Sequence, residues 1–138
     1  MSNNRSDHVL VVHPDGNFER CELAGNVLAV MQGLVGGYVE RVKLNPNDIL
    51  LVNDEGAVNG MPRNELAEQV ATLLMAKNKD DSMPLFQTTH SVILFGPVVF
   101  ASQEGDRISG VMHTTKTLVE LFSMNRTNEK VGDGYPNG

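Results

Sequence analysis

Two pairs of short β-prone segments, each pair joined by a four-residue turn, constrain the fold of this chain more than any other feature of its sequence. The four segments are, in order, His8–His13, Phe18–Leu23, Tyr38–Leu44 and Ile49–Val52. The turns are Pro14–Asn17 and Asn45–Asp48, both built from the residues that tight turns favour. Because turns this short join antiparallel neighbours, the pattern predicts two β-hairpins. The almost wholly apolar Ile49–Val52 is expected in the interior of the sheet.

Three further segments repeat their apolar residues at helical spacing. They are Val27–Val35, Glu65–Met75 and Lys116–Phe122. Asn26 and Asn64 stand where an N-cap residue is expected, and Thr114 or Thr115 can cap the last helix. A glycine pair that begins at Gly36 predicts the end of the first helix, because glycine accepts the left-handed conformation found there.

The most β-prone stretch is Ser91–Ala101, in which Gly96-Pro97 indicates a bulge or a sheet edge. Arg107–Met112 can add one more short strand. The order β-β-α-β-β-α-β-(β)-α predicts an α+β fold, a mixed or antiparallel sheet with about three helices packed on it. At 138 residues the chain suits one domain. We expect a disordered tail over 1–7, a single domain over 8–124 and a flexible C-terminal tail over 125–138.

Charge and composition exclude several classes of protein. With 17 acidic and 11 basic residues and a net charge of −6, the chain lacks the basic face of a general nucleic-acid binder. No apolar run is long enough to span a membrane, and the N-terminus does not resemble a signal peptide. The one cysteine, Cys21, excludes an internal disulfide. These observations favour the cytoplasm.

The sequence offers no catalytic motif, cofactor motif or metal-binding pattern. Its four histidines are dispersed and never approach each other at ligand spacing. No nucleophile elbow and no phosphate-binding loop of the usual kind is present. We therefore expect no catalytic residue, no metal and no cofactor.

Four blocks of sequence carry a resemblance to a known family. They are Leu34–Glu40, Asn53–Gly56, Asn59–Asn64 with Ala67, and Ile93–Phe100. In order and approximate spacing, over about His8–Phe100, they resemble a family catalogued as domain of unknown function 3846. The resemblance implies a short protein of phages, plasmids or mobile islands, often encoded among counter-defence genes, and it supplies no catalytic residues. The stretch after Ala101 lies outside the resemblance.

The loop between Asn53 and Asn64 is the candidate ligand-binding site. It holds Asn53, Asn59, Gly60, Arg63 and Asn64. A guanidinium and free backbone N–H groups at the start of a helix are typical of a site for an anion or a nucleotide phosphate. Each residue also has a local alternative role, with Asn64 as a cap, Asn59-Gly60 as a turn and Arg63 solvated.

Taken with the resemblance, these features predict a small non-enzymatic binding protein that sequesters a host immune nucleotide signal, such as a cyclic nucleotide. The first alternative is a protein-binding inhibitor of a restriction or CRISPR-type effector. The second is a hydrolase that uses carboxylates such as Asp54, Glu55 and Glu104. We also expect a homo-oligomer, most simply a twofold dimer, because the strands carry more apolar residues than three helices can cover. The apolar strand Ser91–Phe100, with its edge signal, can supply the interface between subunits.

Overall fold

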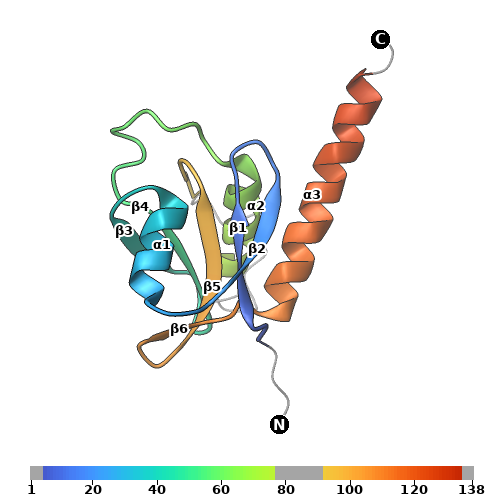
Figure 1. The fold of residues 1–138 in the computed structure, drawn as a ribbon. Coiled ribbons are helices and arrows are strands. Elements are labelled where there is room, and N and C mark those ends of the chain that lie inside the picture. The colour runs from blue at the N-terminus through green and yellow to red at the C-terminus, as the bar shows by residue number, and fades with distance from the viewer. Residues whose placement is uncertain (1–4, 77–91, 135–138) are drawn as a thin grey trace.

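The computed structural model describes residues 5–76 and 92–134 of the chain. Its elements in chain order are β1 (His8–Val12), β2 (Phe18–Glu22), α1 (Val27–Val35), β3 (Val39–Lys43), β4 (Asp48–Asn53), α2 (Glu65–Ala76), β5 (Val98–Glu104), β6 (Arg107–Ser109) and α3 (His113–Gly134). This order is the one that the sequence predicts. Figure 1 shows the strands gathered in one sheet with the helices packed around it.

The strands form one antiparallel sheet in the order β2-β1-β5-β4-β3, with β6 paired to β5. Both predicted hairpins are confirmed, β1 with β2 and β3 with β4. β5 lies between them, so that Val99 is the partner of Val11 on one side and of Leu51 on the other. The α+β fold is therefore confirmed, and the sheet is antiparallel throughout the described strands.

The prediction of a bulge or an edge at Gly96-Pro97 is wrong. These residues directly precede β5, which is the central strand of the sheet. Pro97 has no N–H to donate, and it stands just before Val98, where the pairing with β1 begins. Of the strand expected over Ser91–Phe100, residues 98–100 belong to β5, which is paired on both sides and presents no open edge to another subunit. Residues 92–97 precede β5, and Ser91 lies outside the described residues.

The sheet separates two apolar cores. On one face the odd-numbered strand residues pack against Met31 and Val35 of α1. On the other face the even-numbered ones, such as Leu10, Leu50 and Phe100, pack against α2 and α3. All these side chains are buried within a single chain. The surplus of apolar strand residues that suggested a dimer therefore does not exist, and the homo-oligomer stays a prediction.

The expected helix ends follow their local chemistry with one exception. Asn26 Oδ1 accepts a hydrogen bond from Ala29 N, and Gly36 ends α1 with φ 84°. Asn64 Oδ1 accepts from Ala67 N at the start of α2. The cap expected from Thr114 or Thr115 is wrong, because α3 already begins at His113. The Thr115 hydroxyl instead donates to the buried Asp48 Oδ1, at 2.6 Å.

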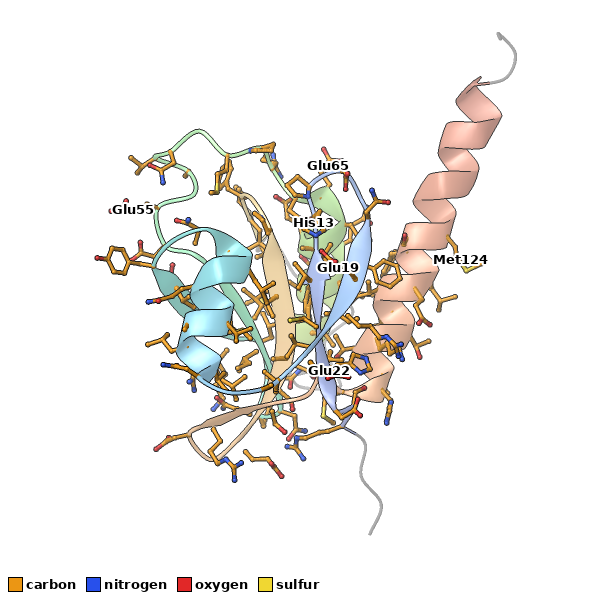
Figure 2. The ribbon with its side chains drawn as sticks, viewed as in Figure 1. His13, Glu19, Glu22, Glu55, Glu65 and Met124 are labelled. Atoms are coloured by element: carbon orange, nitrogen blue, oxygen red, sulfur yellow. The ribbon has the colours of Figure 1, made fainter. Side chains whose placement is uncertain are left out.

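The structure describes hydrogen bonds and a helix within the two tails that the sequence suggests, and the bounds of the domain stay a prediction. Arg5 Nε donates to Ser102 Oγ at 2.9 Å and Ser6 N donates to Val111 O at 2.8 Å, so the chain is bonded to the sheet region from Arg5 onward. At the other end α3 continues to Gly134, through residues for which a tail was expected. Figure 2 shows Met124 on α3 pointing away from the rest of the fold. None of the helices in the described part of the chain is long and apolar enough to cross a membrane.

Candidate functional site

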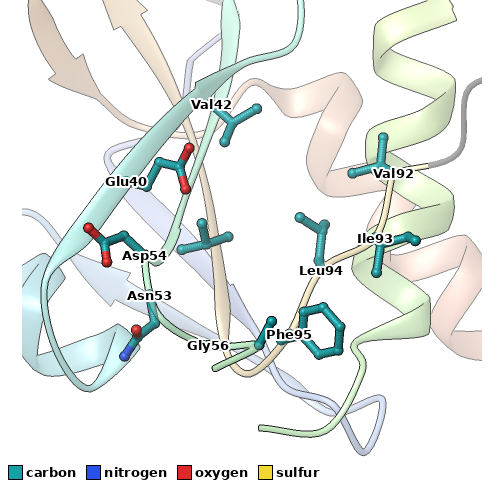
Figure 3. Close-up of a pocket in the computed structure, with 11 residues that line it drawn as sticks. Glu40, Val42, Asn53, Asp54, Gly56, Val92, Ile93, Leu94 and Phe95 are labelled. Atoms are coloured by element: carbon teal, nitrogen blue, oxygen red, sulfur yellow. The ribbon is translucent and has the colours of Figure 1, made fainter. Parts of the chain in front are cut away.

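A groove of about 350 Å³ lies between the β3–β4 hairpin and the segment that leads into β5 (Figure 3). One wall consists of Glu40 and Val42 of β3 with Val52 of β4. Asn53 at the end of β4 and the following Asp54, Gly56 and Ala57 close one end, and residues 92–95 form the opposite wall. Binding sites for small ligands commonly measure about 300–1,000 Å³, so a groove of this size accepts a few side chains or a small molecule.

Strand alternation decides which β3 side chains reach the groove. Successive residues of a strand point to opposite faces of its sheet. Glu40 and Val42 therefore lie on the α2 side, as does Val52, which is paired with Glu40. Arg41 and Lys43 lie on the α1 side, and Arg41 Nη1 donates to the carbonyl oxygen of Asp106 there. The groove-side face of β3 thus carries a carboxylate and an apolar residue.

The second wall is anchored to the start of α2. Leu94 N donates to Glu68 Oε2 at 3.0 Å, while the Leu94 carbonyl accepts from Asn64 N at 2.8 Å. Gly96 N donates to Pro62 O at 2.8 Å. Since α2 is itself packed into the core, these bonds hold residues 92–95 at a fixed separation from the sheet.

Arg63 and Glu68 form a two-pronged ion pair at this anchor. Arg63 Nε lies 3.0 Å from Glu68 Oε2, and Arg63 Nη2 lies 2.7 Å from Glu68 Oε1. The Glu68 side chain is 11% exposed and that of Arg63 is 53% exposed. Burial raises the pKa of Glu68, but the hydrogen bonds from Arg63 and from Leu94 N outweigh burial and hold that pKa below its ordinary value. The same carboxylate raises the pKa of Arg63.

This ion pair changes what Arg63 offers to a ligand. A guanidinium holds a phosphate best with two parallel N–H donors. In this structure Nε and Nη2 already donate to the two oxygens of Glu68. A phosphate that uses those donors has to displace a carboxylate. Arg63 is therefore a structural partner of Glu68, and its role as a phosphate ligand stays a prediction.

Asn53 and Asn64 are buried and occupied by the fold. Asn64 Nδ2 donates to the carbonyl oxygens of Val12 and Gly96, at 2.8 and 2.9 Å, in addition to the cap bond. Asn53 Nδ2 donates to Val35 O at the end of α1, and its Oδ1 accepts from Glu55 N. Both amides join segments that are far apart in the sequence.

Asn59 and Gly60 form the turn that was the alternative interpretation of this loop. Asn59 N donates to Glu55 O at 2.8 Å and Gly60 N donates to Ala57 O at 3.2 Å. The φ of Gly60 is 76°, in the left-handed region that favours glycine. Of the five candidate residues, Asn53 is the one that lines the groove. The structure therefore does not gather the five residues around one pocket.

The carboxylates suggested for a hydrolase do not meet. Asp54 follows the C-terminal end of β4, whereas Glu104 ends β5 beside the opposite end of β4, where Asp48 pairs with Ser102. Glu104 instead lies 3.6 Å from Arg5 Nη1. Within residues 5–76 and 92–134, no group of three or more histidine, cysteine, aspartate or glutamate side chains is placed to hold a metal ion.

The groove itself is the feature that sequence reasoning missed. Asn53 and Asp54 belong to the loop that was singled out, but Glu40, Val42 and Leu94 were assigned only to strands. The alternation of Glu40 and Val42 shows that they share a face. Nothing local shows that residues 92–95 lie across from that face, because their position depends on bonds to α2.

Comparison with known proteins gives one match. The family described as a domain of unknown function (DUF3846) matches residues 6–123. The match continues past Ala101, so the C-terminal part of the domain up to residue 123 belongs to the family pattern and is not specific to this chain. No curated protein and no solved structure matches.

Proposed function

Since this chain belongs to the DUF3846 family, whose description assigns no activity, we propose from its own surface that it is a non-enzymatic binding protein that holds a segment of a partner protein in the groove between β3 and residues 92–95. The observation that carries this proposal is the apolar lining of the groove. Val42, Val52 and Leu94 face it, and the ring of Phe95 lies at its end (Figure 3). Apolar walls give little to a phosphate and much to a protein side chain.

Exposed apolar side chains adjoin the same groove. Six large apolar side chains are exposed in the described part of the chain. Three of them, Tyr38, Val58 and Ile93, belong to segments that form or adjoin the groove. Ile93 lines it, Val58 follows the lining residue Ala57, and the carbonyl of Tyr38 accepts from Asp54 N. Of these side chains Ile93 lines the groove itself, and exposed apolar groups at a concavity are typical of protein interaction sites.

In the counter-defence setting that the sequence resemblance implies, the partner is a host defence effector, and this protein inhibits it by occupying a surface. Sequestration of a host nucleotide signal is the second candidate. It is favoured by the half-exposed Arg63 next to the N-terminus of α2. Glu68 already accepts from two of the five N–H donors of Arg63, which leaves fewer donors for a phosphate and is why we place it second.

A selection from a displayed library of random peptides tests the proposal. Peptides that bind the protein are then measured against Ile93→Ala, with Leu28→Ala as the matched control. Ile93 and Leu28 are 56% and 57% exposed, but Leu28 lies on α1, across the sheet from the groove. We expect Ile93→Ala to weaken binding about tenfold, or about 1.4 kcal/mol, and Leu28→Ala to leave it unchanged. If no selected peptide depends on Ile93, the groove is not a protein-binding site.

A nucleotide panel separates the other functions. The protein is incubated with cyclic nucleotides, and each nucleotide is recovered after heat denaturation. Nucleotide that is retained by the protein and released intact supports sequestration, whereas altered nucleotide indicates an enzyme. On our proposal, no nucleotide is retained.

A further inference from the structure

We propose that the groove recognises a partner segment that inserts a lysine or arginine side chain between apolar neighbours. This inference rests on the proposed function and adds the chemical class of its partner. It is carried by the arrangement of charge along the walls of the groove, together with their apolar surface.

Among the described residues, the lining of the groove carries charge of one sign. Its ionisable residues in 5–76 and 92–134 are Glu40 and Asp54, and no lysine, arginine or histidine of these ranges lines it. The two nearest basic residues of β3, Arg41 and Lys43, lie on the opposite face of the sheet. In Figure 3 the Glu40 carboxylate extends from β3 toward the groove, whereas Asp54 lies at its rim with its carboxylate pointing away from Leu94 and Phe95. Both are exposed.

The shape of a lysine or arginine side chain matches this arrangement. Each has an apolar stem and a cationic tip, and such side chains commonly bury the stem while the tip stays near water. The stem would contact Val42 and Val52, and the tip would lie at the rim beside Glu40. The half-buried ring of Phe95 adds an aromatic face, to which cations are attracted.

Other occupants fit the groove less well. A phosphate would meet two carboxylates and, among the described lining residues, no cation. A wholly apolar segment would leave Glu40 and Asp54 beside it without a partner charge, at a cost in desolvation. The charge of the lining therefore favours a cationic segment over both.

The test uses the peptides selected above and two variants with equal changes in net charge. Glu40→Gln with Asp54→Asn removes both charges of the groove. Glu19→Gln with Glu22→Gln removes two charges from β2, at the opposite edge of the sheet, where Figure 2 shows both residues. Binding is measured by fluorescence anisotropy at low and high ionic strength.

We expect peptides that depend on Ile93 to be enriched in lysine or arginine. The groove double variant should bind them roughly two- to thirtyfold more weakly, the range for two solvent-screened ion pairs. The β2 double variant should bind them as the parent does. Added salt should weaken binding to the parent more than binding to the groove double variant, because salt screens the charges that the variant lacks.

Three outcomes overturn the inference. Peptides that depend on Ile93 but are neutral or acidic contradict the cationic partner and leave the proposed function intact. Equal binding of the peptides by the parent and by the groove double variant also contradicts the cationic partner and leaves the proposed function intact. If the parent is a dimer by light scattering and Ile93→Ala is a monomer, the occupant of the groove is a second copy of this chain.

Discussion

Asn64 Nδ2 lies 2.8 Å from the carbonyl oxygen of Val12, a residue 52 positions earlier in the chain. The same amide nitrogen donates to Gly96 O, and Asn64 Oδ1 accepts from Ala67 N. One buried side chain therefore joins the end of β1, the entry to β5 and the first turn of α2.

We expect Asn64→Ala to destabilise the fold by about 3–7 kcal/mol. A lost N-cap costs about 1 kcal/mol, and each of the two buried carbonyls that lose a donor adds roughly 1–3 kcal/mol when water cannot replace it. The free energy of unfolding in urea measures this. The control is Asn59→Ala in the exposed turn, expected to change stability by less than about 0.5 kcal/mol. A loss of only about 1 kcal/mol would mean that the cap alone matters.

Glu68→Gln should reduce stability at neutral pH and have a smaller effect in acid. The folded-state pKa of Glu68 is lowered, so its carboxylate contributes stability above its unfolded pKa of about 4.3. That contribution is lost as the pH falls through the folded pKa. We expect the free energy of unfolding of the variant to be about 1 kcal/mol lower than that of the parent at pH 7. The difference is this small because Arg63 is half exposed and solvent screens the ion pair.

Urea unfolding of Glu68→Gln and the parent at several pH values from 7 down to 3 measures this difference. It should shrink below about pH 4.5. A difference that does not vary with pH would show that Glu68 acts through packing and not through its charge.

Gly96→Ala should destabilise the fold by about 1–2 kcal/mol or more. Its φ is 77°, where an alanine is strained, and an added Cβ would lie 2.5 Å from Met61 Sδ. The double variant with Met61→Ala removes the steric contact but not the backbone strain. A double-mutant cycle in urea separates the two, and a zero coupling energy would exclude the contact with Met61 as a cause.

Thr115→Val should cost about 1–3 kcal/mol, because it keeps the shape of the side chain but removes the donor to the buried Asp48 carboxyl. Thr115→Ser keeps the hydroxyl and should lose less. Urea unfolding measures both variants. A larger loss in Thr115→Ser than in Thr115→Val would attribute the effect to the methyl group and not to the hydrogen bond.

Local chemistry was enough to predict the order of the elements and the two hairpins, but not the position of β5 between them. Asn26, Gly36 and Asn64 end or begin helices by bonds to residues within four positions, so their roles can be predicted from sequence. The position of β5 between the two hairpins depends on pairings such as Leu10 with Phe100, which are 90 positions apart. The prediction of a bulge at Gly96-Pro97 was wrong because the start of a strand and a bulge have the same local signal in the sequence.

The candidate site shows the same division. The turn at Asn59-Gly60 was predictable, since it follows from glycine's freedom at positive φ. The pairing of Arg63 with Glu68 spans five residues, more than the three or four that place side chains side by side on a helix. It arises because Arg63 precedes α2, and it removes the free guanidinium that the phosphate hypothesis assumed.

The central position of β5 also has a consequence for synthesis on the ribosome. Both hairpins leave the ribosome before β5 does, and an isolated hairpin is at best marginally stable. Until Glu104 has emerged, β1 and β4 lack their shared partner β5, although their residues are buried in the finished fold. The finished sheet instead exposes the more charged β2 and β3. Ribosome-stalled chains of increasing length should therefore become protease-resistant only once residue 104 has cleared the exit tunnel. Until then the nascent chain has to be kept from associating with other chains.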